Sequence, residues 1–596
     1  MADETRRSNS QLRTRHRQAL LEVEDWLYAN CSDVTSLKRE DVGRIREGMV
    51  GGWRLKLETV SGTRVVDVMV PASFPFQPAR LRLVDLPEDE DWPHVEKDNV
   101  LCLVSETATF DPDDPAGGVI TLLNMVIDLA DLVASGRADD EFRREVLSYW
   151  GHRVPGGRKS ILSLVDPAPA SRLVSVWDGP VRQVIADNPD DLLKWLRNRH
   201  LGGRKLRVGI GALVWLGEPL TPGRFPKTAA GILELAKSVD AQDVLVKAAA
   251  STAGDLTVAL GMETDNGVAI AGLTVPRPCA VRGRDPIHDG FRLGRTPPWL
   301  VARRFFGSEA ILRADLKRAD HSWIHGRDQD SRAGGIRDKT VVIFGCGSIG
   351  GPVAVALAQA GVSKFVLVDP DVLNPSNLGR HPLGAQYLGL YKSESLAAKL
   401  RQELPHVSAR AVVGRIEDVL LTAKDLAEAD LIVSAVGDWG AEVMLDAWSE
   451  ANGRPVPIVY GWTEAHACAG HAVAVMKAGR CFRDGFDATG LPHLRVAEFP
   501  HSTVRYEPAC GAVYQPYGPI ELQGTLAVIG ELALDVMLQP PSQSIHRLWI
   551  GRERHLRQMG GQWSPAWSIL MGSRTEGGFL HDRPWASTLG DRSLAA

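Results

Sequence analysis

The sequence predicts an α/β protein built around one strand–turn–helix–strand unit of the kind that binds nucleotides. An apolar run at 341–344 leads into three closely spaced glycines, Gly345, Gly347 and Gly350. Apolar residues at helical spacing follow, and a second apolar run, 365–368, ends at Asp369. The glycines let the backbone turn sharply and approach a phosphate, and the helix N-terminus offers free N–H groups. A carboxylate roughly 20 residues after the last glycine can accept ribose hydroxyls, so the segment predicts a Rossmann-like nucleotide site.

The residues after Asp369 favour ATP over a nicotinamide dinucleotide. The polar residues that follow the second strand are Asp371, Asn377, Arg380 and Lys392, and Asp438 follows a further apolar run at 431–436. Cationic side chains can meet the charge of a triphosphate, and a carboxylate at a strand end can hold Mg²⁺. ATP and Mg²⁺ are therefore the expected ligands.

These spaced positions resemble ThiF/MoeB-type adenylating domains, the nucleotide-binding core of ubiquitin-activating enzymes. The resemblance covers residues 318–519 and implies adenylation of a protein's C-terminal carboxylate. It implies that Asp369 contacts the ribose, that Arg380 and Lys392 contact phosphates, that Asn377 supports them and that Asp438 holds Mg²⁺. One departure is His381, which stands where relatives often carry glutamine.

The same resemblance implies a homodimer. In such dimers the partner subunit donates an arginine from just upstream of the first strand. Both Arg318 and Arg327 occupy that region, and the sequence leaves the choice between them open.

Length and composition limit the number of domains, the class of protein and its expected location. With 596 residues the chain is expected to form three or four domains. A net charge of −5 argues against a dedicated nucleic-acid binder. The N-terminal segment has no apolar core of a signal peptide and no long apolar run is evident, so we expect a soluble, cytoplasmic protein without membrane attachment. The seven cysteines form no CxxC pair, which argues against a disulfide framework or a Cys-rich zinc site.

The N-terminal block, residues 1–150, is predicted to be an α+β domain. Its amphipathic helix spans 11–28, strands follow at 53–60, 64–70 and 79–84, and a second helix spans 119–133. This order, with the Pro-Phe-x-Pro corner that begins at Pro75 and Cys102 further on, resembles a ubiquitin-conjugating enzyme. The resemblance implies that Cys102 is a thioester nucleophile, for which a thiol suits because its thiolate both attacks and leaves readily.

The conjugating family places a His-Pro-Asn triplet before its cysteine, and this chain departs from that pattern. His94, preceded by Pro93, takes the position of the family's asparagine relative to Cys102. We expect His94 to supply the polar role, either by donating a hydrogen bond or by lowering the pKa of the thiol. Asn99 is the weaker alternative.

The middle block, residues 151–310, is expected to be an α/β domain without catalytic motifs. A linker is predicted at 156–170, strands at 181–185, 206–216, 244–247 and 267–273, and a helix at 192–196. Its expected role is to position the two other domains or to hold the protein substrate.

The third domain, residues 311–596, carries the candidates for a second thioester cysteine. Cys510 lies in a Pro/Gly-flanked stretch suited to an exposed loop and is the first candidate. Cys481, whose arginine neighbours would lower its pKa, is the second, and direct transfer to Cys102 is the third possibility. Cys468 is expected to be packed, Cys346 to fill space in the glycine turn, and residues 574–596 to form a poorly ordered tail.

An activating and a conjugating unit in one chain resembles the fused proteins of bacterial anti-phage operons, notably the CBASS type. The resemblance implies that the activated carboxylate is the C-terminus of a cGAS-like nucleotidyltransferase and that the acceptor is a lysine amine on a target protein. Related operons use ubiquitin-like proteins instead, and the sequence leaves both open. Two rivals are carrier-protein sulfur transfer, which has no use for the N-terminal block, and a non-catalytic scaffold, which has no need of Arg380, Lys392 and Asp438 together.

Overall fold

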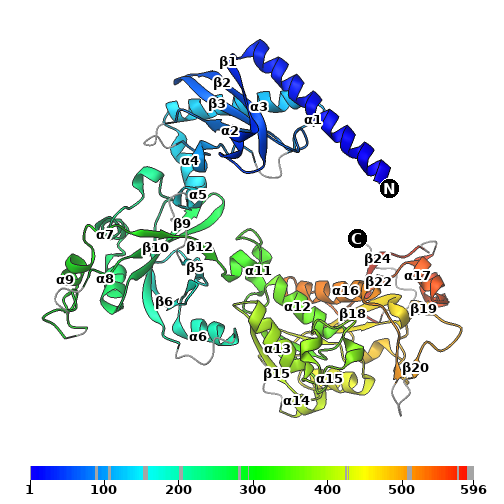
Figure 1. Ribbon diagram of the computed structural model, residues 1–596. Coiled ribbons are helices and arrows are strands. Elements are labelled where there is room, and N and C mark those ends of the chain that lie inside the picture. Colours follow the sequence, from blue (N-terminus) through cyan, green and yellow to red (C-terminus); the bar gives the residue numbers. More distant parts are fainter. Residues whose placement is uncertain are drawn as a thin grey trace.

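A computed structural model describes residues 2–86, 92–104, 109–151, 159–199, 206–279, 284–292, 294–422, 426, 428–506, 513–572 and 576–586. Figure 1 shows three successive domains, each with its own sheet, and the middle domain lies between the other two.

The N-terminal domain is a four-stranded antiparallel sheet with two long helices on one face. The strands follow the order β1-β2-β3-β4, as expected for successive hairpins. The elements are α1 (Ala2–Asn30), β1 (Ser32–Leu37), α2 (Arg39–Gly43), β2 (Met49–Thr59), β3 (Gly62–Pro71), β4 (Arg80–Leu83), η1 (Lys97–Asn99), α3 (Pro115–Ala134), α4 (Ala138–Arg144) and α5 (Val146–Gly151). The predicted helices and strands of this domain are present, with α1 longer than predicted and β1 not foreseen.

Helix α3 is long and apolar enough to cross a membrane, judged by length and composition alone. In this structure it is a core helix, because Val119, Leu122 and Val126 are buried against Leu55 of β2 and Leu27 of α1. Its apolar composition is thus accounted for by packing within the domain.

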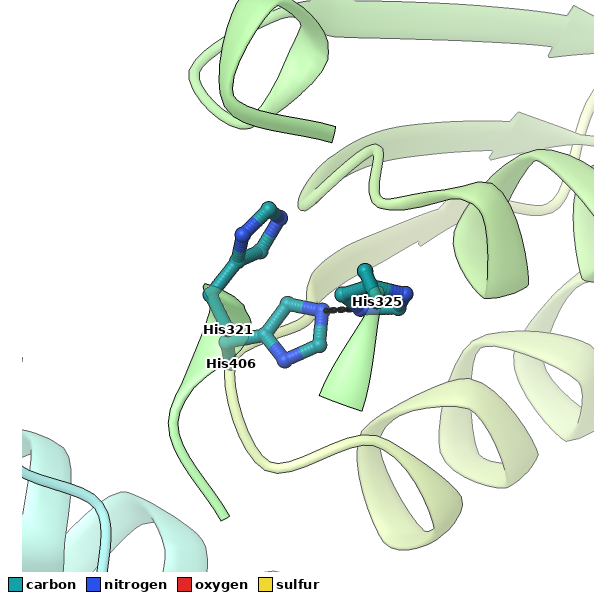
Figure 2. Close-up of side chains that lie close together, drawn as sticks. All are labelled: His321, His325 and His406. Carbon is teal, nitrogen blue, oxygen red and sulfur yellow. Dashed lines mark hydrogen bonds between the residues drawn. The ribbon is translucent and has the colours of Figure 1, made fainter. Parts of the chain in front are cut away.

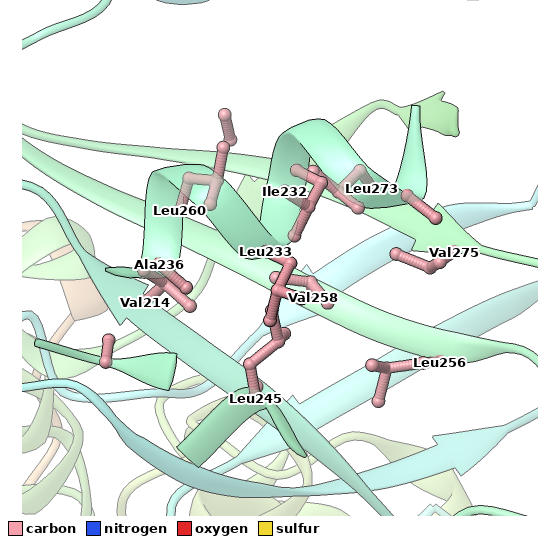
Figure 3. Close-up of a cluster of buried hydrophobic side chains, with 14 of the residues drawn as sticks. Val214, Ile232, Leu233, Ala236, Leu245, Leu256, Val258, Leu260, Leu273 and Val275 are labelled. Atoms are coloured by element: carbon pink, nitrogen blue, oxygen red, sulfur yellow. The ribbon is translucent and has the colours of Figure 1, made fainter. Parts of the chain in front are cut away.

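The middle domain is an eight-stranded mixed sheet in the order β11-β10-β9-β8-β6-β7-β5-β12. Its elements are β5 (Ser160–Ser163), β6 (Arg172–Asp178), β7 (Arg182–Ala186), α6 (Pro189–Asn198), β8 (Gly209–Trp215), η2 (Pro222–Arg224), α7 (Ala229–Lys237), α8 (Gln242–Ser251), β9 (Leu256–Thr264), β10 (Gly267–Val275), α9 (Pro298–Phe305), β11 (Leu312–Ala314) and β12 (Leu316–Arg318). Figure 3 shows how Leu233 and Leu245 from two helices pack on Val258 and Leu260 of the sheet.

Three sequence predictions for this domain need correction. Residues 244–247 belong to α8 rather than to a strand, because the apolar run continues into the alanine-rich segment 248–250 and buries one helical face. The predicted linker at 156–170 contains β5, whose Ile161 is buried in the sheet. The sheet also extends beyond residue 310, because β11 and β12 are its two edge strands.

The C-terminal domain has an eight-stranded sheet in the order β15-β14-β13-β16-β17-β18-β22-β24, in which β15 to β17 are parallel. Its elements are α10 (His321–Ile324), α11 (Ser331–Ile336), β13 (Thr340–Phe344), α12 (Gly350–Ala360), β14 (Lys364–Val368), η3 (Pro375–Asn377), η4 (Ala385–Tyr387), α13 (Lys392–Glu403), β15 (Ser408–Val412), α14 (Ile416–Thr422), β16 (Leu431–Ser434), α15 (Trp439–Ala451), β17 (Ile458–Thr463), η5 (Ala465–Ala467), β18 (Ala469–Val475), η6 (Phe482–Gly485), β19 (Ala497–Glu498), β20 (Arg505–Tyr506), β21 (Val513–Tyr514), α16 (Pro519–Leu538), β22 (Ile545–Ile550), α17 (Glu553–Gln558), β23 (Gln562–Trp563), α18 (Pro565–Met571) and β24 (Phe579–Pro584).

Helices cover both faces of this sheet. Apolar residues of α12, α13 and α16 pack on one face, and those of α14 and α15 pack on the other. The chain passes from β13 to β14 on one side and later to β16 on the other, and a parallel sheet opens a crevice at the carboxyl ends of such strands.

The predicted C-terminal tail needs correction. Residues 579–584 form β24, the edge strand paired with β22, and Trp585 is buried with its indole N–H donating to the Cys481 carbonyl at 2.8 Å. Residues 587–596 lie outside the described part of the chain.

Candidate active sites

A cavity of about 590 Å³ opens at the carboxyl ends of β13, β14 and β16. This volume is in the range of small-molecule sites. Of the nucleotide residues predicted from the sequence, the cavity is lined by Gly345, Gly347, Asp369, Asp371, Asn377, Arg380, Lys392 and Asp438. The ninth, Gly350, packs beneath the turn.

The three glycines of the turn have different roles. Gly345 has a φ of +84°, and a Cβ there would lie 2.7 Å from the Ala435 carbonyl oxygen. Gly350 begins α12, and a Cβ there would lie 1.9 Å from the Gly345 carbonyl oxygen. A Cβ at Gly347 would meet no heavy atom within 4 Å among the described residues. Gly345 and Gly350 are therefore required by the fold, whereas Gly347 leaves room on the cavity side.

Asp369 is held rigidly at the end of β14. Its carboxylate accepts the Cys346 N–H at 2.7 Å and the Asp371 N–H at 2.8 Å. The side chain is buried, and this burial raises the pKa of the carboxyl above its ordinary value. A carboxylate with two N–H partners retains free lone pairs, so Asp369 can accept further hydrogen bonds from a ligand hydroxyl.

The two predicted phosphate cations enter the cavity from different elements. Lys392 begins α13, is buried, and its ammonium lies 2.9 Å from the Asp371 carboxylate. The Arg380 guanidinium lies over the Tyr517 ring, 4.9 Å from its centroid. The Tyr517 hydroxyl in turn lies 2.7 Å from Ser348 Oγ in the glycine turn. Both cations are thus oriented by neighbours while they line the cavity.

Asn377 and Asp438 are fixed by backbone contacts. The Asn377 side-chain oxygen accepts the Asn374 N–H at 3.1 Å. Asp438 is the N-cap of α15, and one carboxylate oxygen accepts the Ala441 N–H at 3.0 Å. An exposed carboxylate at the cavity is the ligand type that Mg²⁺ prefers, so Asp438 fits the predicted metal role.

His381 holds the glycine turn. Its Nε2–H donates to the Cys346 carbonyl at 2.7 Å and its Nδ1 accepts the Leu383 N–H at 3.2 Å. Burial lowers the pKa of the imidazole, so the ring is neutral at pH 7. Histidine thus stands where relatives often carry glutamine, and like glutamine it can donate a hydrogen bond.

Cys102 is exposed on the N-terminal domain, just after η1. Its N–H donates to the His94 carbonyl at 2.7 Å, and the His94 N–H donates to the Tyr149 hydroxyl at 2.8 Å. The His94 ring nitrogens lie 3.5 Å from the carboxylates of Glu141 and Glu145. His94 therefore positions the cysteine through its backbone, while its ring faces two acids.

The pKa of the Cys102 thiol is raised, first by burial and then by the nearby Glu96 carboxylate. The role of His94 in lowering the thiol pKa is not among the causes that act here and stays a prediction. Asn99 has a φ of +61° in the turn before the cysteine. A raised pKa leaves a smaller share of thiolate at neutral pH than an ordinary cysteine has.

The other cysteines differ in accessibility. Cys510 lies outside the described residues, between β20 and β21, which pair with each other. Cys481 is buried, and its pKa is raised by burial and by the carboxylates of Asp446 and Asp484. The net effect is thus opposite to the expected lowering by its arginine neighbours: Arg483 attracts the Cys481 thiolate but is also paired with Asp446, and burial and the carboxylates outweigh it.

Cys468 and Cys346 are both buried. Burial raises the pKa of the Cys468 thiol to about 12. Cys346 sits in the core beneath the turn, in contact with the helix and sheet residues of that cluster.

The two upstream arginines are not equivalent. Arg318 is buried in ion pairs with Asp320 and Asp328. Arg327 is exposed. A donated arginine must reach a partner, and Arg318 is committed to its own chain.

Several cavity residues were not foreseen from the sequence. They are Ser348, which lies within the glycine turn, and residues from strands and turns far along the chain, namely Trp462, Thr463, Gln515 and Tyr517. The segment 515–519 does carry a signal, because a Tyr-Gly-Pro run before an apolar helix marks a helix start.

Two parts of the chain match known protein families. Residues 329–537 match the ThiF family, and residues 45–155 match the prokaryotic E2 family B. The chain is 24% identical over 82% of its length to the ATP-dependent ubiquitin transferase-like protein Cap2 of Pseudomonas aeruginosa, covering 84% of that protein. It is 26% identical to Cap2 of Vibrio cholerae over 39% of this chain and 41% of that one.

Two further similarities are to an activating enzyme and to a solved structure. The SAMP-activating enzyme E1 of Haloferax volcanii is 31% identical over 25% of this chain and 54% of that protein. The crystal structure of Escherichia coli MccB matches 44% of this chain and 69% of its own with 16% identity and a TM-score of 0.31. The two family matches confirm the predicted fold class and the pairing of a ThiF-type adenylating domain with an E2-like domain.

Proposed function

We propose that this chain uses ATP to activate the C-terminal carboxylate of a protein, carries the acyl group as a thioester, and joins it to an amine. One observation carries the proposal. A single chain holds a nucleotide-sized cavity lined by a fixed carboxylate and two oriented cations, and it also holds an exposed thiol in an E2-like domain. The Pseudomonas aeruginosa protein named an ATP-dependent ubiquitin transferase-like protein is similar over 82% of this chain.

Adenylation takes place in the cavity. Asp369 binds the ribose hydroxyls, Lys392 and Arg380 neutralise the phosphates, and the N–H groups of the glycine turn approach them closely. Asp438 holds Mg²⁺, which when bound offsets the negative charge of the phosphates. A carboxylate oxygen of the substrate attacks the α-phosphorus, and pyrophosphate leaves with the electrons of the broken P–O bond.

Two thioester steps follow. The Cys510 thiolate attacks the acyl carbon and AMP leaves. Gln515, which lies five residues after Cys510 in the sequence, lines the cavity. The Cys102 thiolate then takes the acyl group and releases Cys510 as a thiolate. Finally a lysine amine of the target attacks, loses a proton, and releases Cys102.

The substrate proposed is the C-terminus of a cGAS-like nucleotidyltransferase in bacterial anti-phage defence, and a ubiquitin-like protein is the alternative. We place the reaction in the cytoplasm and in a homodimer. Arg327, which is exposed, is the arginine available for donation to the partner's cavity. The middle domain positions the two reactive domains.

Cysteine variants of the full chain test this order of steps. With ATP and native host lysate, wild type should form a thiol-sensitive adduct, and mass spectrometry of material trapped on Cys102 would identify the acyl group. Cys102→Ala should stop conjugation but keep substrate-dependent ATP–pyrophosphate exchange, and Cys510→Ala should keep exchange but lose acyl transfer.

Cys279→Ala is the matched control, because Cys279 is exposed on the middle domain and has no proposed role. It should behave as wild type in both assays. Conjugation that continues in Cys102→Ala would overturn the proposed final step.

A further inference from the structure

Three histidines meet at the junction between the middle domain and the nucleotide-binding fold. His321 and His325 lie one turn apart at α10, which directly follows β12, and His406 lies between α13 and β15. Each offers one ring nitrogen, and these nitrogens lie within 4.8 Å of one another (Figure 2). None of the three lines the nucleotide cavity, so the cluster is not explained by adenylation.

Hydrogen bonds fix how two of these rings are protonated. His321 Nε2 lies 2.7 Å from the Gly361 carbonyl oxygen, and His325 Nδ1 lies 2.7 Å from the Gln359 carbonyl oxygen. A carbonyl oxygen only accepts, so both nitrogens carry hydrogen and the opposite nitrogen of each ring keeps its lone pair. Histidines that bind metals usually donate their other N–H to a carbonyl or carboxylate in this way.

The third ring leaves a polar atom unsatisfied. His406 Nε2 lies 2.8 Å from His325 Nε2 (dashed in Figure 2), and since His325 Nε2 is an acceptor, His406 must donate there. Its Nδ1 is then a buried lone pair with no hydrogen-bond partner in the described part of the chain. Two nitrogens bound to one tetrahedral Zn²⁺ lie about 3.3 Å apart, so a shift of roughly half an ångström would let a metal take the place of the shared hydrogen, which moves to Nδ1 of His406.

The surroundings keep all three rings neutral without adding net positive charge. Burial lowers the pKa of each imidazole, that of His406 to about 3, so the lone pairs are available at pH 7. Arg337 also lowers the pKa of His321 and His406, but it is paired with Asp166 at 2.6 Å. Asp320, at the start of α10, acts on His321 in the opposite direction.

We propose that His321, His325 and His406 form a binding site for a divalent transition metal, with Zn²⁺ the best match. Three imidazole ligands with a fourth position left for water are one of the arrangements that Zn²⁺ takes in proteins. The ion would fasten α10, the first element after the middle sheet, to the α13–β15 loop, while the existing hydrogen bonds of His321 and His325 hold α10 on the end of α12. It would therefore fix where the nucleotide-binding fold begins relative to the middle domain.

Metal binding to the full chain tests the proposal directly. After EDTA treatment and equilibration with micromolar ZnSO₄, we expect about one tightly bound Zn²⁺ per chain by elemental analysis. Co²⁺ should give the visible absorption of a tetrahedral site, and Zn²⁺ should raise the melting temperature by about 5 °C or more. Wild-type protein that binds no Zn²⁺ and shows no Co²⁺ band would overturn the proposal, whatever the variants do.

Variants separate a metal site from structural packing. His325→Ala and His406→Ala should reduce bound Zn²⁺ from about one to nearly none. His493→Ala is the matched control, because His493 is exposed and outside the cluster. This variant should still bind about one Zn²⁺ per chain. His406→Cys should still bind Co²⁺ and add a thiolate-to-metal charge-transfer band. An equivalent of Zn²⁺ that persists in His325→Ala would overturn the assignment to these residues.

Discussion

The substitution Gly347→Ala separates nucleotide binding from folding at the glycine turn. A Cβ at this position meets no heavy atom within 4 Å among the described residues, and Gly347 lines the cavity. The added methyl therefore occupies space where a bound phosphate would approach the backbone. We expect the protein to fold normally and to bind ATP more weakly.

Two free-energy changes set the expected magnitudes, one in folding stability and one in ATP binding. Replacing glycine by alanine at a backbone conformation that alanine tolerates stabilises the fold by about 0.4–1 kcal/mol, because the unfolded chain loses freedom. Displacing a phosphate removes at least one charged N–H contact, which contributes about 1.5–3 kcal/mol. The dissociation constant for ATP should therefore rise about 10- to 150-fold while the melting temperature stays the same or increases slightly.

Titration with a fluorescent ATP analogue and thermal unfolding measure the two effects separately. Gly530→Ala is the matched control, because its Cβ is also unopposed but lies in α16 away from the cavity, and it should bind ATP as wild type does. Gly350→Ala should instead unfold at a lower temperature, because its Cβ would clash with the Gly345 carbonyl. Folded Gly347→Ala that binds ATP with wild-type affinity would refute the placement of the phosphates at this turn.

Three further predictions follow from the same geometry. Asp438→Asn should still accept the Ala441 N–H and so keep the melting temperature of the wild type. Its substrate-dependent ATP–pyrophosphate exchange should fall about tenfold or more and require more Mg²⁺. A variant that exchanges at the wild-type rate at low Mg²⁺ would contradict this. Burial raises the pKa of Glu442 to about 7, so its stabilising contribution is complete below its ordinary pKa and is lost as the pH rises through 7. Glu442→Gln should therefore melt with less pH dependence than wild type between pH 5 and 8, and parallel melting curves for the two proteins would count against this. Glu96→Gln should lower the pKa of the Cys102 thiol and speed its alkylation by iodoacetamide at pH 7.5, and unchanged alkylation would show that Glu96 does not raise that pKa.

The nucleotide half of the fold was readable from the sequence because its signals are contiguous. Strand β13, the glycine turn, α12 and β14 follow one another directly, and the carboxylates Asp369 and Asp438 each stand at the end of an apolar run. Local pattern fails where a run is short. The apolar run 244–247 fits a strand or a helix equally by periodicity, and its burial against the sheet made it part of α8.

The remainder of the sites depends on contacts between distant segments. Tyr517 reaches Arg380 only because α16 packs across the sheet, and β24 is a strand only because β22 offers it an edge. The histidine cluster depends both on local sequence spacing and on a contact between distant segments. The spacing of His321 and His325 is visible in the sequence as one helical turn, but nothing in the sequence brings His406 to them.

The two domain junctions differ in strength, and this bears on how an acyl group could pass between them. Helix α5 of the N-terminal domain is built into the core of the middle domain, where the buried Trp150 indole N–H donates to the Gly272 carbonyl at 3.0 Å. The middle and C-terminal domains are joined in part by the half-exposed pair Arg337–Asp166, and an exposed ion pair contributes only about 0–1 kcal/mol. They are also joined by Arg318 of β12, whose buried guanidinium pairs with Asp320 and Asp328 and donates to the Val268 carbonyl at 2.8 Å. Movement of the thiol toward the cavity at the second junction would therefore have to disturb these buried contacts, and a metal at the histidine cluster would tie α10 further to the C-terminal domain.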